Sequence, residues 1–190
     1  MRKLLARRRS EGGFTLVEIA IVIVIIGLLI GGVLKGQAMI EGAKSKRVVK
    51  QADEVRTAIM AFYDKYGAYP GDEDSALFPP GTDAEGDGDG QIETNAEQYE
   101  VWADLALAGL ISGSYDGTSD LPNHAFGDVV QVYWVNPGTG YNHFIRFQYL
   151  PAEIALELDL KHDDGAYDTG SIVGSADYAA GTNVHLYFRF

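Results

Sequence analysis

A run of sixteen uncharged residues, from Ile19 to Leu34, constrains this chain more than any other feature. Together with Phe14–Val17 it forms about 20 apolar residues, enough for a helix to cross the hydrocarbon core of a bilayer. A buried core helix of a soluble protein is rarely this apolar on every side. A cluster of arginines at 7–9 precedes the run. The positive-inside rule therefore predicts a cytoplasmic N-terminus and export of everything that follows.

Two simpler interpretations compete with a membrane-spanning segment of special function. One is a secretory signal peptide, but the apolar run is longer than usual for one, and residues 35–66 continue the helical pattern. The other is a plain single-span anchor, which hydropathy alone does not separate. Glu18 argues for more than an anchor, because a carboxylate inside the span is costly in lipid and calls for a cationic partner. Cleavage between Gly13 and Phe14 would create such a cation, the α-amino group of Phe14 on a neighbouring copy.

The sequence Gly12-Gly13-Phe14-Thr15-Leu16-Val17-Glu18 resembles the type III signal of type IV prepilins and type II secretion pseudopilins. The resemblance implies cleavage after Gly13 by prepilin peptidase and N-methylation of Phe14. It also implies that Glu18 pairs with the N-terminus of an adjacent subunit. Residues 1–13 would form the leader peptide, 14–36 the transmembrane and filament-core helix, and 37–190 the exported pilin head.

The same resemblance implies a location and a set of partners. The chain would first reside in the inner membrane with its N-terminus in the cytoplasm. An inner-membrane assembly platform would then build it into a homopolymer or a mixed pilin filament, either an extracellular pilus or a periplasmic pseudopilus. Type IVa pilins usually carry a C-terminal disulfide loop, and this chain has no cysteine. The choice between a type IV pilus pilin and a type II secretion pseudopilin stays open.

An amphipathic pattern continues the apolar segment. Apolar residues recur at intervals of 4, 3, 4, 3 and 4, which places them on one stripe of a helix: Val48, Ala52, Val55, Ile59, Phe62 and Tyr66. We expect one helix from Phe14 to Tyr66, ended by Gly67 and Pro70. Within the apolar part, Gly27/Gly31 and Gly32/Gly36 are spaced to allow close helix packing in lipid, or they only loosen the helix.

The C-terminal third has the pattern of a small sheet. Residues 129–135 and 141–149 are rich in β-branched and aromatic side chains and are joined by Asn-Pro-Gly-Thr-Gly, which predicts a hairpin. Residues 184–190 alternate as a third strand, and Pro151 opens a short helix. An antiparallel sheet packed on the long helix is the α+β architecture of pilins.

Charge is concentrated in the exported part. Residues 66–190 carry twenty-one acidic and three basic side chains, a formal charge of −18. A surface this acidic repels phosphate backbones, so we expect no nucleic-acid partner. Divalent cations are attracted instead.

An acidic loop over residues 71–95 has the spacing of a calcium loop: alternate oxygen ligands, a glycine turn at Gly90 and an inward apolar residue at Ile92. It predicts a structural Ca²⁺ site of EF-hand type. The candidate ligands are Glu85, Asp87, Asp89, Gln91, Glu93 and Glu97. A solvated acidic turn is the alternative. Thr94-x-x-Glu97 is also a helix capping box, and this role competes with metal binding by Glu97.

A second cation site over His162, Asp163, Asp164 and Asp168 is weaker than an ordinary Asp-Gly turn at Gly165. No phosphate loop, nucleophile elbow or HExxH motif occurs, so we expect no enzyme. The sequence thus favours a structural filament subunit. A membrane-anchored calcium-binding module that never polymerises and an exported hydrolase using carboxylates are the more remote alternatives.

Overall fold

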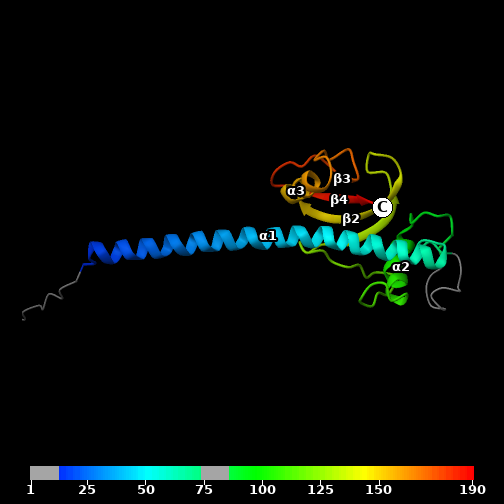
Figure 1. The fold of residues 1–190 in the computed structure, drawn as a ribbon, viewed down its shortest axis with the longest axis horizontal. Coiled ribbons are helices and arrows are strands. Elements are labelled where there is room, and N and C mark those ends of the chain that lie inside the picture. The colour runs from blue at the N-terminus through cyan, green and yellow to red at the C-terminus, as the bar shows by residue number, and fades with distance from the viewer. Residues whose placement is uncertain (1–12, 74–85) are drawn as a thin grey trace, which may run out of the picture. The chain divides into compact units, whose positions relative to one another are not determined.

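The computed structural model describes residues 13–73 and 86–190 (Figure 1). The chain divides into two compact units between Gly42 and Ala43. The elements in order are α1 (Leu16–Tyr66), α2 (Asn95–Leu107), β1 (Val130–Val135), β2 (Asn142–Pro151), α3 (Ala152–His162), β3 (Ile172–Gly174) and β4 (Asn183–Arg189). The predicted long helix is confirmed, and it begins two residues later than expected because Thr15 caps it.

The first unit contains the apolar part of α1. Every Phe, Leu, Ile and Val side chain from Phe14 to Leu34 is exposed, from 47% at Ile19 to 89% at Leu16. Among the described residues, α1 is the one helix long and apolar enough to cross a membrane. Leaving so much apolar surface in water is unfavourable, so this stretch needs lipid or other protein around it.

The second unit contains the rest of α1, a four-stranded sheet and two shorter helices. The strand order is β1-β2-β4-β3 and every neighbouring pair is antiparallel. The predicted hairpin is present, with Val130 paired to Phe147 and Val135 to Asn142. Helix α3 follows β2 without a loop, since Pro151 is both the last residue of the strand and the N-cap of the helix.

One hydrophobic core joins these elements. The predicted stripe on α1 is buried, with Val48, Ile59 and Phe62 fully so, and Tyr66 packs against the core as a partly buried residue. Helix α2 contributes Trp102 and Leu105, and the inner face of the sheet adds its alternate residues. The α+β class predicted from the sequence is therefore what the structure shows.

Two features of the sheet differ from the prediction. Strand β3 has three residues, and it lies at the edge of the sheet beside β4. The register of β2 on β4 shifts between Phe147 and Leu150, and Tyr149 within this bulge has a φ of 47°. A left-handed conformation at a tyrosine is strained, so the bulge is held by the pairing on either side of it.

Candidate functional site

The start of α1 is fixed by a reciprocal pair of hydrogen bonds between Thr15 and Glu18. The backbone N–H and the hydroxyl of Thr15 both donate to Oε2 of Glu18, at 2.8 Å each. The backbone N–H of Glu18 donates in return to the Thr15 hydroxyl at 3.2 Å. This is a capping box, which satisfies N–H groups that a helix start leaves without partners. The carboxylate predicted to serve assembly therefore also caps its own helix.

The predicted processing bond lies just outside this cap. Gly13 and Phe14 precede the first helical residue, and the Phe14 side chain is 84% exposed. The capping bonds use the N–H of Thr15 and not that of Phe14, so cleavage after Gly13 would leave them intact. The roles of Gly13, Phe14 and Glu18 in processing and assembly stay predictions that this geometry accommodates.

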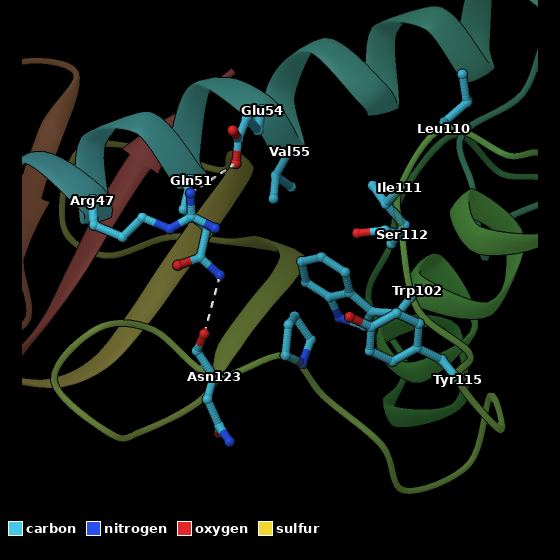
Figure 2. A pocket seen from close by; sticks show the side chains of 11 residues that line it. Arg47, Gln51, Glu54, Val55, Trp102, Leu110, Ile111, Ser112, Tyr115 and Asn123 are labelled. Carbon is cyan, nitrogen blue, oxygen red and sulfur yellow. Dashed lines mark hydrogen bonds and ion pairs between the residues drawn. The ribbon is translucent and has the colours of Figure 1, made fainter.

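A cavity of about 550 Å³ in the second unit opens beside α1 (Figure 2). Arg47 and Glu54 form a 4.0 Å ion pair at its wall, and Gln51 donates to the carbonyl of Asn123 at 3.3 Å. Trp102 lines the cavity while remaining 1% exposed. These two contacts tie α1 to the loop that contains Asn123, whereas the indole N–H of Trp102 is buried without a hydrogen-bond partner among the described residues.

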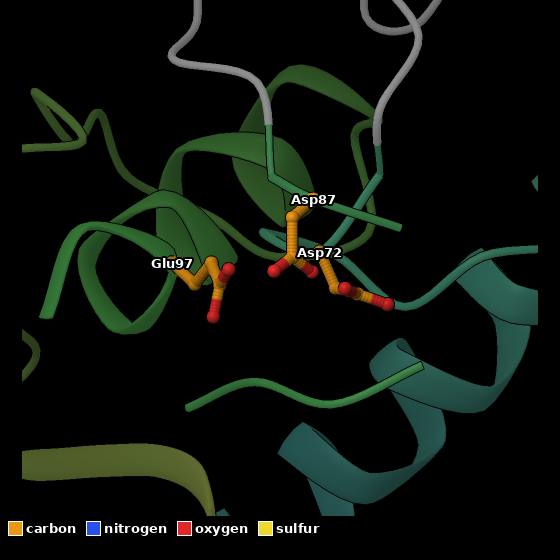
Figure 3. A group of neighbouring side chains, drawn as sticks. All are labelled: Asp72, Asp87 and Glu97. Atoms are coloured by element: carbon orange, nitrogen blue, oxygen red, sulfur yellow. The ribbon is translucent and has the colours of Figure 1, made fainter. Parts of the chain in front are cut away.

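Three carboxylates meet beside the start of α2. Asp72, Asp87 and Glu97 each offer one oxygen, and these oxygens lie within 4.8 Å of one another (Figure 3). Asp72 and Glu97 are buried, whereas Asp87 is exposed. Asp72 follows the end of α1, Asp87 lies 15 residues further along, and Glu97 belongs to the first turn of α2. We call these three residues the acidic cluster.

The surroundings of the acidic cluster disfavour the state in which all three of its carboxyl groups are ionised. Burial raises the pKa of Asp72 to about 6, and the nearby carboxylates of Asp89, Glu97 and Asp87 act in the same direction. A hydrogen bond from the N–H of Gly90 to Oδ2 of Asp72, 2.9 Å long, opposes the shift. Like charges this close repel each other, so the cluster is the kind of group that a cation would stabilise.

The structure places the predicted calcium ligands in several roles. Asp87 and Glu97 come together, and Glu97 also caps α2 as predicted, with its Oε2 accepting from the N–H groups of Glu93 and Thr94 at 2.8 and 2.9 Å. Asp89 instead accepts from the backbone and side chain of Gln91 at 2.8 and 2.9 Å.

Two further ligand predictions remain. The side chain of Glu93 is exposed and lies outside the acidic cluster. Glu85 lies outside the described residues. Calcium binding by this loop stays a prediction.

A second group of carboxylates surrounds the end of α3. It contains the predicted Asp163 and Asp164 together with Asp159, while His162 and Asp168 are exposed and are not part of it. Asp159 accepts from the Tyr178 hydroxyl at 2.7 Å and from the N–H of Gly165 at 3.0 Å. Asp163 and Asp164 likewise accept from neighbouring backbone and hydroxyl donors. These hydrogen bonds stabilise the Asp-Gly turn at Gly165, which the sequence offered as the alternative to a metal site.

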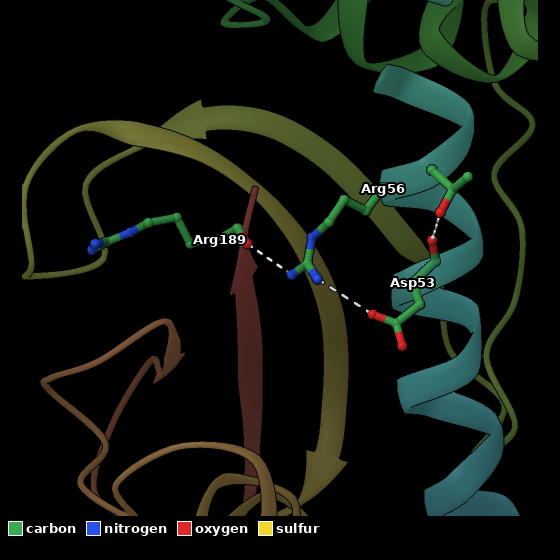
Figure 4. Close-up of polar contacts among 4 residues, drawn as sticks. Asp53, Arg56 and Arg189 are labelled. Atoms are coloured by element: carbon green, nitrogen blue, oxygen red, sulfur yellow. Dashed lines mark hydrogen bonds and ion pairs between the residues drawn. The ribbon is translucent and has the colours of Figure 1, made fainter. Parts of the chain in front are cut away.

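A polar strap ties α1 to the last strand (Figure 4). Arg56 donates to the backbone carbonyl of Arg189 at 2.8 Å and pairs with Asp53 at 3.3 Å. The Arg189 guanidinium in turn donates to the Thr139 hydroxyl at 2.9 Å. The strap fixes the C-terminal end of β4 against the amphipathic half of α1.

The sequence did not predict the roles of two residues, namely Thr15 as a helix cap and Asp72 as a member of the acidic cluster. Thr15-x-x-Glu18 has the same spacing as Thr94-x-x-Glu97, so the capping pattern itself could have revealed the first. Asp72 lies in a loop between helices and joins Glu97 only through the fold, and no spacing rule connects them.

Comparison with known proteins bears on the N-terminal segment. Residues 8–34 match the family model of the prokaryotic N-terminal methylation motif. Neither the comparison with curated proteins nor the comparison with solved structures gives a match. The matched range contains the predicted processing bond, Glu18 and the exposed apolar stretch of α1. This chain therefore carries, at residues 8–34, the prepilin signal that marks type IV pilins and pseudopilins.

Proposed function

We propose that this protein is a structural subunit of a type IV pilus-like filament, assembled after prepilin peptidase cuts between Gly13 and Phe14. The observation that carries the proposal is the coincidence of the methylation motif with an apolar helical segment whose large side chains are all exposed. The motif implies processing by prepilin peptidase and filament assembly in general. The exposed helix supplies the surface that lipid covers before assembly and that other subunits cover afterwards.

In this proposal, Glu18 sets the position of one subunit against the next along the filament. A carboxylate in the apolar part of the helix is stabilised when a cation approaches it in a dry environment. The α-amino group of Phe14 on an adjacent subunit is that cation. Because Glu18 is already held by Thr15, its carboxylate is presented in a fixed position at the helix start.

A pseudopilin of a type II secretion system is the second candidate. The absence of cysteine from the whole sequence favours it, since a C-terminal disulfide loop is usual in type IVa pilins. Both candidates share the processing step and the Glu18 contact. Neither requires an enzymatic activity of the head.

The test separates the charge of Glu18 from its capping role. Glu18→Gln keeps a capping side chain but removes the charge, because Gln also serves in a capping box. In cells that carry the assembly machinery, we expect this variant to be processed and retained in the membrane, with at least about tenfold less protein in the sheared surface fraction. Glu41→Gln, a change of the same kind further along α1, is the control. Sheared filaments at the normal level from Glu18→Gln would contradict the proposal.

A further inference from the structure

We propose that Asp72, Asp87 and Glu97 bind one Ca²⁺ ion, which fastens the segment leaving α1 to the start of α2. This inference does not depend on filament assembly, because it concerns the head alone. It differs from the calcium loop expected from the sequence, since its central ligand is Asp72, and Asp89 and Gln91 are engaged with each other.

Three backbone segments are already brought together around the acidic cluster (Figure 3). The N–H of Gly86 donates to the carbonyl of Glu73 at 2.8 Å, and that of Gly88 donates to the carbonyl of Asp72 at 2.9 Å. A side chain at Gly86 would meet the backbone of Asp72 at 2.5 Å, so only glycine allows this approach. Asp87 is thereby held over Asp72 by the bonds on both sides of it.

The third ligand is fixed independently. Glu97 has its Oε2 bound by the N–H groups of Glu93 and Thr94 in the capping box of α2. A carboxylate has two oxygens and several acceptor positions, so capping through one oxygen leaves capacity for a cation. Each of the three segments thus contributes one positioned carboxylate to the same point.

The Asp72 carboxylate, which belongs to the acidic cluster, has one buried oxygen without a partner. Asp72 is 2% exposed, and its Oδ2 accepts from the N–H of Gly90. Its Oδ1 is buried and has no hydrogen-bond donor within residues 13–73 and 86–190. None of the four ion pairs found among these residues involves the cluster. Buried carboxylate oxygens normally have donors or a metal, and a cation would meet this need.

The ligand type and spacing suit calcium. Ca²⁺ binds oxygen ligands at 2.3–2.6 Å, so two of its ligands can stand up to about 5 Å apart. The three cluster oxygens lie within 4.8 Å of one another. An adjoining cavity of about 240 Å³, lined by Gly86, Asp87 and Glu97 among others, leaves room for the water ligands that complete such a site.

The test is calcium titration of the full chain purified in detergent, followed by calorimetry and by thermal unfolding with and without Ca²⁺. For the wild type we expect one Ca²⁺ per chain and a higher Tm in calcium. Asp72→Asn keeps the shape of the side chain and removes its charge, so we expect calcium affinity to fall at least about tenfold and the calcium-dependent Tm shift to disappear. Its calcium-free Tm should be no lower than that of the wild type, because the repulsion is relieved.

Two further variants make the outcome decisive. Asp164→Asn removes a carboxylate from the other acidic group and should leave calcium binding unchanged. Glu97→Gln keeps a capping side chain and should lose affinity as Asp72→Asn does, which covers the case in which Asp72→Asn does not fold. The proposal is overturned if the wild type binds no calcium, or if Asp72→Asn and Glu97→Gln bind it as tightly as the wild type. Failure here would leave the filament proposal untouched, since that proposal rests on Glu18 and the sheared fraction.

Discussion

Glu18 stabilises its own helix in the isolated subunit, and Thr15 is the residue that makes this possible. Their reciprocal bonds close the first turn of α1 at a point where four backbone N–H groups have no helical partner. The consequence is that the carboxylate does not sample the many rotamers of a free glutamate. A neighbour's N-terminus would meet a preorganised acceptor.

Removing the hydroxyl of Thr15 should loosen this first turn. Loss of an N-cap side chain costs about 1 kcal/mol, which corresponds to roughly a fivefold change in the local opening equilibrium. We predict that Thr15→Val increases amide hydrogen exchange about fivefold at the first turn of α1 in detergent micelles. Glu18→Gln, which can still cap, should exchange almost as slowly as the wild type. Unchanged exchange in Thr15→Val would mean that the box does not hold the helix start.

His143 gives the head a dependence on pH. Its side chain is 4% exposed, Nε2 accepts from the N–H of Ile92 at 3.3 Å, and the ring packs on Tyr69 and Trp134 at centroid distances of 4.4 and 4.9 Å. Burial lowers the pKa of His143 to about 4, and the charge of Asp89 opposes this shift. Protonation would also force Nε2 to give up its role as acceptor.

The sign of the pH effect follows from this lowered pKa. The unfolded chain takes up the proton near pH 6.5 and the folded chain only near pH 4, so stability from His143 is complete above 6.5 and falls as pH drops between these values. One proton contributes a slope of at most about 1.4 kcal/mol per pH unit. Asp72 has the opposite effect on the free energy of unfolding. Because its pKa is raised to about 6 in the folded chain, its contribution to stability increases as the pH falls below that value.

The measurement must therefore compare variants rather than read one curve. We predict that His143→Gln flattens the loss of unfolding free energy between pH 6.5 and 4 relative to the wild type, whatever its stability at neutral pH. His162→Gln changes an exposed histidine and serves as the control. Equal slopes for His143→Gln and the wild type would show that His143 does not titrate as described.

At the scale of the element, α1 joins two environments in one helix. Its amphipathic part buries the predicted stripe against the sheet and α2, whereas the large side chains of its apolar part are exposed. Among the described residues, a Cβ built on any of Gly27, Gly31, Gly32 or Gly36 meets no atom within 4 Å outside the nearby backbone of its own helix. These glycines are therefore not required by the packing of the subunit itself.

A substitution at Gly31 separates packing inside the subunit from packing between subunits. Alanine there should raise helix propensity by about 1 kcal/mol without any clash within the chain. If the glycines provide close approach between helices, Gly31→Ala should still lower the yield of sheared filaments several-fold. Gly42→Ala, equally free of clashes in the same helix but beyond the apolar stretch, is the matched control. Normal assembly of Gly31→Ala would show that the glycines only loosen the helix.

The elements that the sequence predicts well are those with a long hydrophobic pattern or a specific capping motif. The stripe from Val48 to Tyr66 predicted the amphipathic half of α1, and the Thr94 capping box marked the start of α2. Strand β3 was missed because three residues, Ile172–Gly174, are too few to show an alternation. Tyr149 was missed because its left-handed φ is imposed by the pairing of β2 with β4 and not by its own preference.

At the scale of the whole molecule, charge and hydropathy divide the chain into a basic flank, an apolar segment and an acidic remainder. A basic flank precedes the apolar segment, and residues 66–190 carry most of the negative charge. This division was readable from the sequence because it depends on composition alone. The acidic cluster was readable only in part, because Asp72 comes close to Asp87 and Glu97 in the folded chain and not through any spacing in the sequence.

The most direct test of the central claim is the mature N-terminus, determined by intact mass and N-terminal sequencing of the membrane and sheared surface fractions. We predict a chain that begins with N-methylated Phe14 in both fractions of a cell that assembles the filament. Detection in the sheared fraction would place the processed subunit in an external filament. A chain that retains Met1, or one that begins after Leu34, would contradict the account and identify an anchored or a secreted protein instead.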